Sequence, residues 1–253
     1  MKLKFLHLNI QMGRFLPKIL KYLQKNDFDI INFQEVSGGQ WSPFTAKDLF
    51  AVFEKSLGYH GVLAAHFNNS RTYSGNATFF RKSFQLLDQK TIHLKKTRGP
   101  VDLNHRFLAS RIKSFPRNAL SLLLGKDNKQ IRVINCHLAW GKSPEERAYH
   151  CVQNQRLINY VKTLPRPFIL SGDFNLTDDS RTVKELDKLA RNLTAEHKIK
   201  NTLNPRTHRV QKLFPPGYAV DFVYASKGVQ PKKFQLIEDD LSDHLGLKLD
   251  FEI

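Results

Sequence analysis

The sequence predicts an α/β protein, and two observations support this class. Lys2–Asn9 alternates charged and apolar residues as a strand does, and residues 15–23 then carry apolar side chains at helical spacing. Between residues 84 and 124, short apolar segments alternate with turns and basic residues, which indicates antiparallel sheet. The chain shows no internal repeat, low-complexity stretch or linker. We therefore expect one domain over residues 1–253, long enough to bury a substantial core.

Helices and strands also alternate in the second half of the chain. A helix is predicted over residues 143–161, with Ser143 as N-cap, Pro144 at the first helical position and Glu146 completing a capping box. Another helix is expected from residue 180 to about residue 193. Strands are expected at residues 28–35, 131–138, 167–173, 218–224 and 245–253.

Composition limits the partners and the compartment. Forty Lys and Arg residues against 23 Asp and Glu give a net charge of +17, which favours polyanions: nucleic acid first, and an anionic membrane surface second. The alternative is that this charge serves only solubility. Cys136 and Cys151 have no CxxC spacing and form no disulfide framework, which favours a reducing compartment. No apolar stretch is long enough to span a bilayer or to form a signal peptide, so we expect a cytoplasmic monomer.

One stretch carries the strongest chemical signal. The buried strand that begins at Pro167 ends in Ser171-Gly172-Asp173-Phe174-Asn175. Asp173 and Asn175 are two residues apart, so their side chains point the same way in an extended segment. The carboxylate can polarise a water, and the carboxamide can donate a hydrogen bond to a phosphate without adding negative charge. The alternative for an isolated Gly-Asp-x-Asn is an Asx turn before a helix.

Polar or acidic residues end other predicted strands as well. They are Asn9, Glu35, His137, Asp221, and the pair Asp243 and His244. Each alone fits a structural role, and a buried aspartate such as Asp221 needs a partner in any case. Their joint placement at strand ends favours a shared site.

These positions resemble a known group, the endonuclease/exonuclease/phosphatase superfamily of DNase I-like proteins. The resemblance is carried, in the family's order, by Leu8-Asn9-Ile10, Phe33-Gln34-Glu35-Val36, Asn135-Cys136-His137-Leu138, Ser171-Gly172-Asp173-Phe174-Asn175, Val220-Asp221-Phe222-Val223 and Ser242-Asp243-His244. It implies a four-layered α/β sandwich, in which two mainly antiparallel sheets pack face to face and are flanked by helices. It also implies hydrolysis of a phosphodiester by in-line attack of water.

The resemblance implies a role for each matched residue. Glu35 would be the main ligand of Mg²⁺, or alternatively Mn²⁺, with Asn9 and Asp243 near the ion; Mg²⁺ prefers such oxygen ligands and keeps several waters.

The catalytic groups would be the other five. Asp173 would orient or deprotonate the attacking water, and Asn175 would hold a phosphate oxygen. His244, held by Asp221, would be a charged donor, because a carboxylate beside an imidazole raises its pKa. His137 would assist phosphate binding or protonation of the leaving group.

Three positions depart from the family pattern or match it less closely. Gln11 stands where many relatives have an acidic residue, which disfavours a second tightly held metal ion. The second glutamate of the deoxyribonucleases has no counterpart, and residues 75–77 (Gly-Asn-Ala) occupy that region. Arg117 resembles a family arginine that braces the site.

The fold and the metal site do not name the substrate. Basic segments at residues 93–106 and 198–212 favour nucleic acid, with Trp41, Tyr73 and Trp140 as candidates to stack on a base. Residues 137–147 and 242–247 partly resemble the tyrosyl-DNA phosphodiesterase branch, and apurinic endonucleases are the other near branch. The alternatives are a phosphatase or phospholipase acting on inositol phosphates or sphingomyelin-like lipids, and a non-catalytic nucleic-acid-binding module.

Overall fold

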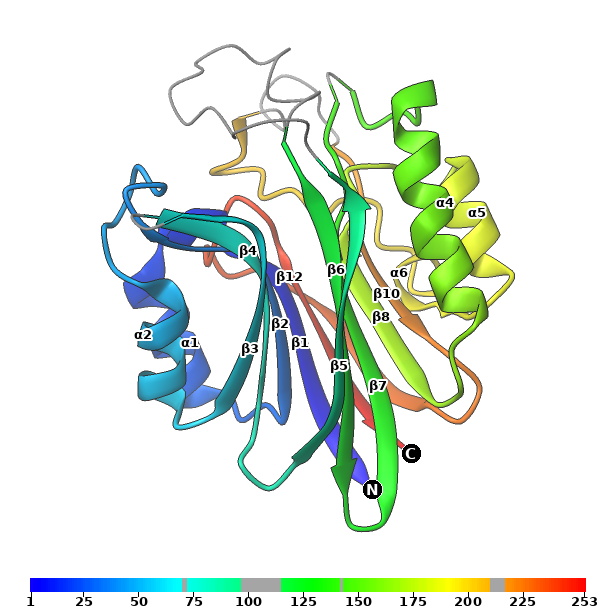
Figure 1. Cartoon of the computed structure of the whole chain (residues 1–253), viewed down its shortest axis with the longest axis horizontal. Helices are drawn as coiled ribbons and strands as arrows, with labels where there is room; N and C mark the ends of the chain where they lie inside the picture. Colours follow the sequence, from blue (N-terminus) through cyan, green and yellow to red (C-terminus); the bar gives the residue numbers. More distant parts are fainter. Residues whose placement is uncertain (70–71, 97–114, 142, 210–216) are drawn as a thin grey trace.

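The computed structural model describes residues 1–69, 72–96, 115–141, 143–209 and 217–253. Within these residues, two six-stranded sheets pack face to face (Figure 1). The first sheet has the order β11-β12-β1-β2-β4-β3, and the second has the order β5-β6-β7-β8-β10-β9. The strands are β1 (Lys2–Asn9), β2 (Ile30–Gly39), β3 (His60–Asn69), β4 (Thr72–Phe80), β5 (Gln85–Lys95), β6 (Arg117–Lys126), β7 (Lys129–His137), β8 (Phe168–Asp173), β9 (Arg191–Asn192), β10 (Asp221–Ala225), β11 (Gln230–Ile237) and β12 (Gly246–Glu252).

The sheets are mainly antiparallel, as predicted. One pair in each sheet is parallel: β1 with β2, and β7 with β8. The other paired strands in these sheets run antiparallel. Both parallel pairs are central and end at the same edge of the sandwich, so their carboxyl ends bring polar residues together there.

Helices cover the outer faces and complete the four layers. Helices α1 (Leu16–Lys25) and α2 (Leu49–Leu57) lie outside the first sheet, and α4 (Ala148–Lys162) and α5 (Arg181–Asp187) lie outside the second (Figure 1). A short helix, α6 (Leu193–Glu196), follows β9. None of the helices in the described part of the chain combines the length and the apolar character needed to cross a bilayer.

The space between the sheets changes from apolar to polar along the strands. On β1, Leu3 and Phe5 belong to the apolar cluster between the sheets, and His7 and Asn9 follow on the same side of the strand. The neighbouring inner strands repeat this order: Ile30 then Asn32 and Gln34 on β2, Val133 then Asn135 and His137 on β7, and Ile169 then Ser171 and Asp173 on β8. The apolar half therefore stabilises the sandwich, and the polar half leads to the site.

Two helix boundaries differ from the prediction. Helix α4 begins at Ala148 and not near Ser143, because the Glu146 carboxylate bonds elsewhere: it accepts from the Thr182 amide (2.9 Å) and hydroxyl (2.6 Å) and from Asn154 (3.0 Å). Helix α5 begins where predicted, with Ser180 as its N-cap, but it ends at Asp187, because Arg191–Asn192 pairs with β10 as a strand.

Candidate active site

The predicted site residues lie together at the polar end of the sandwich. The first sheet contributes Asn9 and Glu35, and the second contributes His137, Asp173 and Asp221. Asp243 and His244 lie in the segment between β11 and β12, and Asn175 follows β8. A cavity of about 320 Å³ opens between the two sets, and Glu35, His137, Asp173, Asn175, Asp243 and His244 line it. Asn9 and Asp221 are buried, and they reach the cavity through the side chains that they bond.

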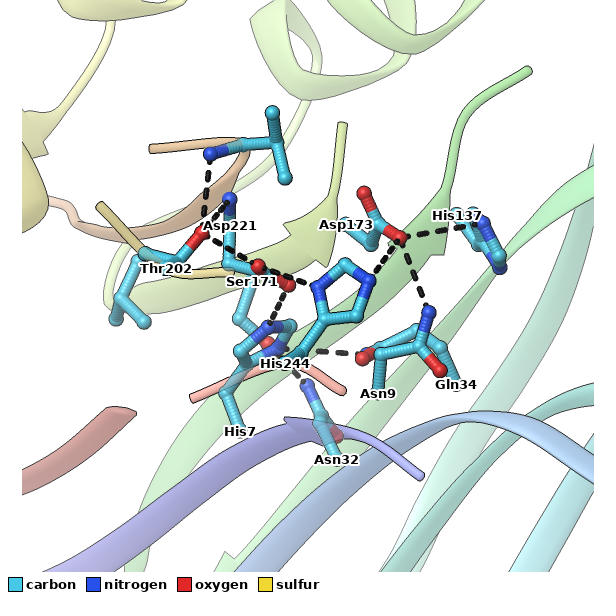
Figure 2. A network of polar contacts seen from close by, with 12 residues as sticks. His7, Asn9, Asn32, Gln34, His137, Ser171, Asp173, Thr202, Asp221 and His244 are labelled. Atoms are coloured by element: carbon cyan, nitrogen blue, oxygen red, sulfur yellow. Dashed lines mark hydrogen bonds and ion pairs between the residues drawn. The ribbon is translucent and has the colours of Figure 1, made fainter. Parts of the chain in front are cut away.

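His244 is held between two aspartates, as Figure 2 shows. Its Nδ1 lies 2.8 Å from Asp221 Oδ2, and its Nε2 lies 3.8 Å from Asp173 Oδ2. Burial alone would lower the pKa of His244, but the two carboxylates raise it well above 6.5. Burial would raise the pKa of Asp221, but His244 and its hydrogen bonds lower it below 3.8. The pair is therefore an imidazolium beside a carboxylate, with Nε2–H directed toward the cavity.

Asp221 has two further hydrogen-bond partners, His7 and Thr202. The His7 Nε2 lies 2.9 Å from Asp221 Oδ1, and the Thr202 hydroxyl donates to Asp221 Oδ2 at 2.7 Å. The Thr202 hydroxyl oxygen accepts the backbone N–H groups of Val220 (3.0 Å) and Asp221 (3.1 Å), so its own hydrogen must point at the carboxylate. The Asp221 carboxylate is fully buried and satisfied on both oxygens.

Asp173 is a buried carboxylate surrounded by donors. Its Oδ1 accepts the Asn175 backbone N–H (3.0 Å) and its Oδ2 accepts the Asn9 side-chain amide (3.0 Å). The Nε2 of His137 lies 3.4 Å from the same Oδ2. Burial raises the pKa of Asp173 to about 6, with the Asp221 charge adding to the rise and His244 opposing it. A carboxyl group with such a pKa can take and release a proton near neutral pH.

The backbone turns sharply to present Glu35 and Asn175. Glu35 has a positive φ of 59° at a β-bulge in β2, and Asn175 has a φ of 53° just after β8. Bulges and left-handed backbone conformations re-aim side chains and concentrate at functional sites. The bulge turns Glu35 toward the cavity, where burial raises the pKa of its carboxyl group and the charges of His244 and Arg117 lower it. The left-handed turn lets the Asn175 side chain donate to the Leu138 carbonyl (3.2 Å).

Close packing holds Asp173 against the neighbouring strand. A Cβ at Gly172 would lie 2.4 Å from both the carbonyl oxygen and the Sγ of Cys136, so only glycine fits where β8 passes β7. The register pairs His137 directly with Asp173.

The donor set suits a divalent cation. Glu35 and Asp243 both face the cavity, and each raises the energy of the other's charge. Burial, with Glu35 adding to the effect, raises the pKa of Asp243 to about 6. Converging carboxylates held together at this energetic cost fit a hard cation, which binds oxygen ligands and offsets their repulsion. Ligand atoms of Asp243, His244 and His208 also lie within 4.8 Å of one another.

A second cavity, of about 230 Å³, adjoins the first and shares Glu35, His137 and Trp140 with it. Its other lining residues are Met12, Trp41, His66, Ser74, Phe115 and Arg117. Arg117 is buried, its Nε–H donates to the Leu138 carbonyl (3.0 Å), and its guanidinium lies 4.6 Å from the centre of the Phe115 ring. Burial lowers the pKa of Arg117 to about 10, so it keeps its charge at neutral pH.

A profile of the Endonuclease/Exonuclease/phosphatase family matches residues 6–244. The chain belongs to this family. The match includes all eight predicted site residues, and membership makes the protein a phosphoester hydrolase. A comparison with curated protein sequences finds no match.

Solved structures of other family members share the fold at low identity. An endonuclease/exonuclease/phosphatase from Bacteroides vulgatus is 16% identical with a TM-score of 0.75, covering 100% of this chain and 99% of that one. A mannosyl-6-phosphatase from Bacteroides thetaiotaomicron is 16% identical with a TM-score of 0.71, covering 99% and 100%. D. rerio TDP2 in complex with a single-stranded DNA product is 15% identical with a TM-score of 0.71, covering 100% and 99%.

Several residues of the candidate site were not predicted from the sequence. His7 had a signal, because it precedes Asn9 by two residues on the same face of β1. Thr202 and His208 lie in a connection without periodicity, and pairing of Leu203 with His244 brings them to the site. His66 comes from the far end of β3, and its ring centroid lies 6.0 Å from that of His137.

Proposed function

We propose that the protein is a divalent-metal-dependent phosphodiesterase that cleaves nucleic acid by in-line attack of water. One observation carries the proposal: a cationic His244 and a titratable Asp173 face each other across 3.8 Å at the floor of a cavity that Glu35 and Asp243 also line. A fixed positive donor, a proton acceptor and a set of metal-binding oxygens are the parts that phosphoester hydrolysis needs.

Each residue has a role that follows from its contacts. His244 donates from Nε2 to a phosphate oxygen and stabilises the charge that develops there, while Asp221 holds its ring through Nδ1. Asp173 orients and deprotonates the attacking water, and the Asn9 amide and the Asn175 backbone fix the carboxylate.

His137 acts as a neutral group. Burial lowers its pKa well below 6.5, and the nearby charges of Arg117 and His244 lower it further. It therefore contributes a hydrogen bond to the phosphate or the leaving oxygen, and it does not add positive charge.

Glu35 and Asp243, with Asn9 nearby, are the residues that would hold Mg²⁺ or Mn²⁺. The cation supplies charge neutralisation at the phosphate when it is bound. The Asn9 side chain already donates to Asp173 through its amide, and its Oδ1 accepts the Gln11 N–H (3.0 Å), so its part is to connect the ligand set to the base.

Two features support a nucleic-acid substrate. The net charge of +17 favours a polyanion, and Lys198, Lys200 and Arg209 are exposed in the same segment that brings His208 to the site. Residues 97–106 and 210–212 of the two predicted basic segments lie outside the described residues. The related TDP2 holds a single-stranded DNA product, which is in line with such a substrate.

The paired cavities give a further argument for a polymer. They meet at Glu35, His137 and Trp140, so a chain whose scissile phosphate lies at the metal ligands extends into a cavity on each side. Tyr218 in the first cavity and Trp140, which lines both cavities, are aromatic side chains on which bases can stack.

A small phosphate ester is the second candidate. A neighbour of this fold is a mannosyl-6-phosphatase, and the first cavity of about 320 Å³ has room for a sugar or inositol phosphate. Such a substrate would fill one cavity and leave the other without a role.

A substrate panel tests the proposal. Purified protein is incubated with Mg²⁺ and single-stranded DNA, duplex DNA, abasic DNA, RNA, a 5′-tyrosyl oligonucleotide, inositol phosphates, mannose 6-phosphate or sphingomyelin. EDTA and Asp173→Asn serve as inactive controls, and Asp127→Asn, an exposed carboxylate in the turn between β6 and β7 and outside both cavities, is the matched active control. Metal-dependent cleavage of a nucleic acid, lost only with EDTA and Asp173→Asn, supports the proposal. Turnover restricted to the small esters would move the assignment to the second candidate, and binding without turnover would make the protein a nucleic-acid-binding module.

A further inference from the structure

Asp221 is the point at which the catalytic imidazolium is attached to the rest of the protein, and one of its three donors is a second histidine. His7 is fully buried and lies 2.9 Å from the carboxylate oxygen that does not bond His244. The ring of His7 therefore fixes the rotation of the Asp221 carboxylate about its Cβ–Cγ bond. Figure 2 shows the two imidazoles on either side of that carboxylate.

The direction of the His7 hydrogen bond can be worked out from its surroundings. The side-chain amide of Asn135 donates to two backbone carbonyls, those of Phe33 (3.0 Å) and Ala77 (2.9 Å). Its Oδ1 is therefore an acceptor, and the Gln34 Nε2, 2.6 Å away, must be the donor. The orientation of the Gln34 amide is fixed by the backbone of the first sheet.

Gln34 in turn selects the tautomer of His7. The Gln34 Nε2 carries a second hydrogen, and it lies 3.4 Å from His7 Nδ1. A nitrogen that faces a donor is best left unprotonated, so the His7 proton belongs on Nε2, where it points at Asp221 Oδ1.

We propose that His7 is a positioning residue of the phosphodiesterase, which orients Asp221 and, through Asp221, the catalytic His244. Its own orientation is fixed by a hydrogen-bond chain that runs from Asn135 through Gln34 to His7. This inference rests on the proposed function for its kinetic test and on the described contacts alone for its spectroscopic test. The Thr202 hydroxyl and His244 both bond Oδ2 of Asp221, so His7 is the donor that the described structure provides for Oδ1. His7 holds Oδ1 of Asp221 in a fixed position, and this also fixes the position of Oδ2, the oxygen that bonds His244.

Three variants separate orientation from general stability. His7→Leu removes the donor and the acceptor, whereas His7→Gln keeps both at the end of a chain of similar length. Thr78→Val is the matched control. Thr78 is as fully buried as His7 and donates to Asn32 at 2.7 Å in the same polar layer, but its hydroxyl does not bond Asn135, Gln34 or His7.

Each variant is measured for kcat, KM and melting temperature on the substrate that the panel identifies. We expect His7→Leu to lower kcat by about 10- to 100-fold, the range seen when a partner that orients an active-site group is lost. KM should change by less than about threefold, since His7 touches no substrate. His7→Gln should recover most of kcat, and Thr78→Val should lose stability without losing kcat. A His7→Leu kcat equal to that of Thr78→Val, or a His7→Gln variant as slow as His7→Leu, would overturn the proposal.

A second measurement needs no substrate and no metal ion. In protein labelled with ¹⁵N-histidine, the His7 resonances are identified by their loss in folded His7→Gln. We expect a neutral ring with the proton on Nε2 and none on Nδ1. A proton on Nδ1, or on both nitrogens, would refute the directed chain whatever the enzyme acts on. If the panel shows no turnover but the His7 tautomer is as expected, the proposed function is wrong and the directed hydrogen-bond chain is still supported.

Discussion

The buried carboxylate of Asp173 makes a prediction in which activity and stability change in opposite directions. The pKa of Asp173 is raised from its usual 3.8 to about 6, chiefly because the residue is only 2% exposed and its charged form loses contact with water. The unfolded chain therefore releases this proton before the folded protein does as the pH rises. Between about pH 4 and pH 6 the folded state loses stability, and above pH 6 the loss is complete.

The size of this loss follows from the pKa values. A rise from 3.8 to about 6 corresponds to about 3 kcal/mol at pH 8, and about 1 kcal/mol of it is already present at pH 4.5. Asp173→Asn has no proton to release, so the difference in unfolding free energy between variant and wild type should grow by about 2 kcal/mol in favour of the variant from pH 4.5 to pH 8. Contributions that do not depend on pH, such as the altered bond to Asn9, cancel in this comparison.

The assay is thermal or urea unfolding in metal-free buffer at both pH values, because a bound cation would favour the charged carboxylate. For a chain of this length, 2 kcal/mol corresponds to roughly 4–8 °C in melting temperature. The variant should at the same time lose nearly all turnover. Asp127→Asn, with an exposed carboxylate in the turn between β6 and β7, should show no such trend. A difference that stays constant with pH, or that grows in favour of the wild type, would contradict the account of Asp173 as a desolvated base.

Three further outcomes follow from the site. His244→Gln should lower kcat by roughly 100- to 1000-fold in steady-state assays, because a neutral amide replaces a preorganised cationic donor; a near-normal kcat would remove His244 from the reaction. Glu35→Gln should raise the Mg²⁺ concentration for half-maximal activity by at least about tenfold in a metal titration, and an unchanged titration curve would argue against Glu35 as a ligand. His137→Gln should cause a smaller loss, about tenfold in kcat, since His137 is neutral and Gln keeps one donor; a loss as large as that of His244→Gln would show that a charge was removed.

The sequence was most informative where the strands are regular. Alternation along Lys2–Asn9 predicts which side chains share a face, and the same rule places His7 beside Asn9. The family motifs at strand ends predicted a four-layered sandwich, and the fold confirms it.

The parts that escaped prediction depend on contacts between distant segments. Thr202 is placed by its backbone bonds to Tyr218 (3.0 Å) and Leu245 (2.7 Å), and no local pattern in its own segment announces them. The start of helix α4 depends on Glu146 bonding Thr182, 36 residues away, in preference to a capping box. Local propensity gives way where such tertiary partners compete for the same side chain.

The change from apolar to polar along the inner faces of the sheets links the rate of the enzyme to its distant core. The first sheet and the segment between its strands β11 and β12 supply Glu35, Asp243 and His244, and the second sheet supplies Asp173 and Asp221. At the opposite end, the apolar cluster that includes Phe5 and Val133 packs the two sheets together. Because the catalytic groups come from both sides of the sandwich, a core substitution that shifts one sheet against the other would change the distances between these groups. Turnover would then fall in a variant that is still folded, although the substituted residue never meets the substrate.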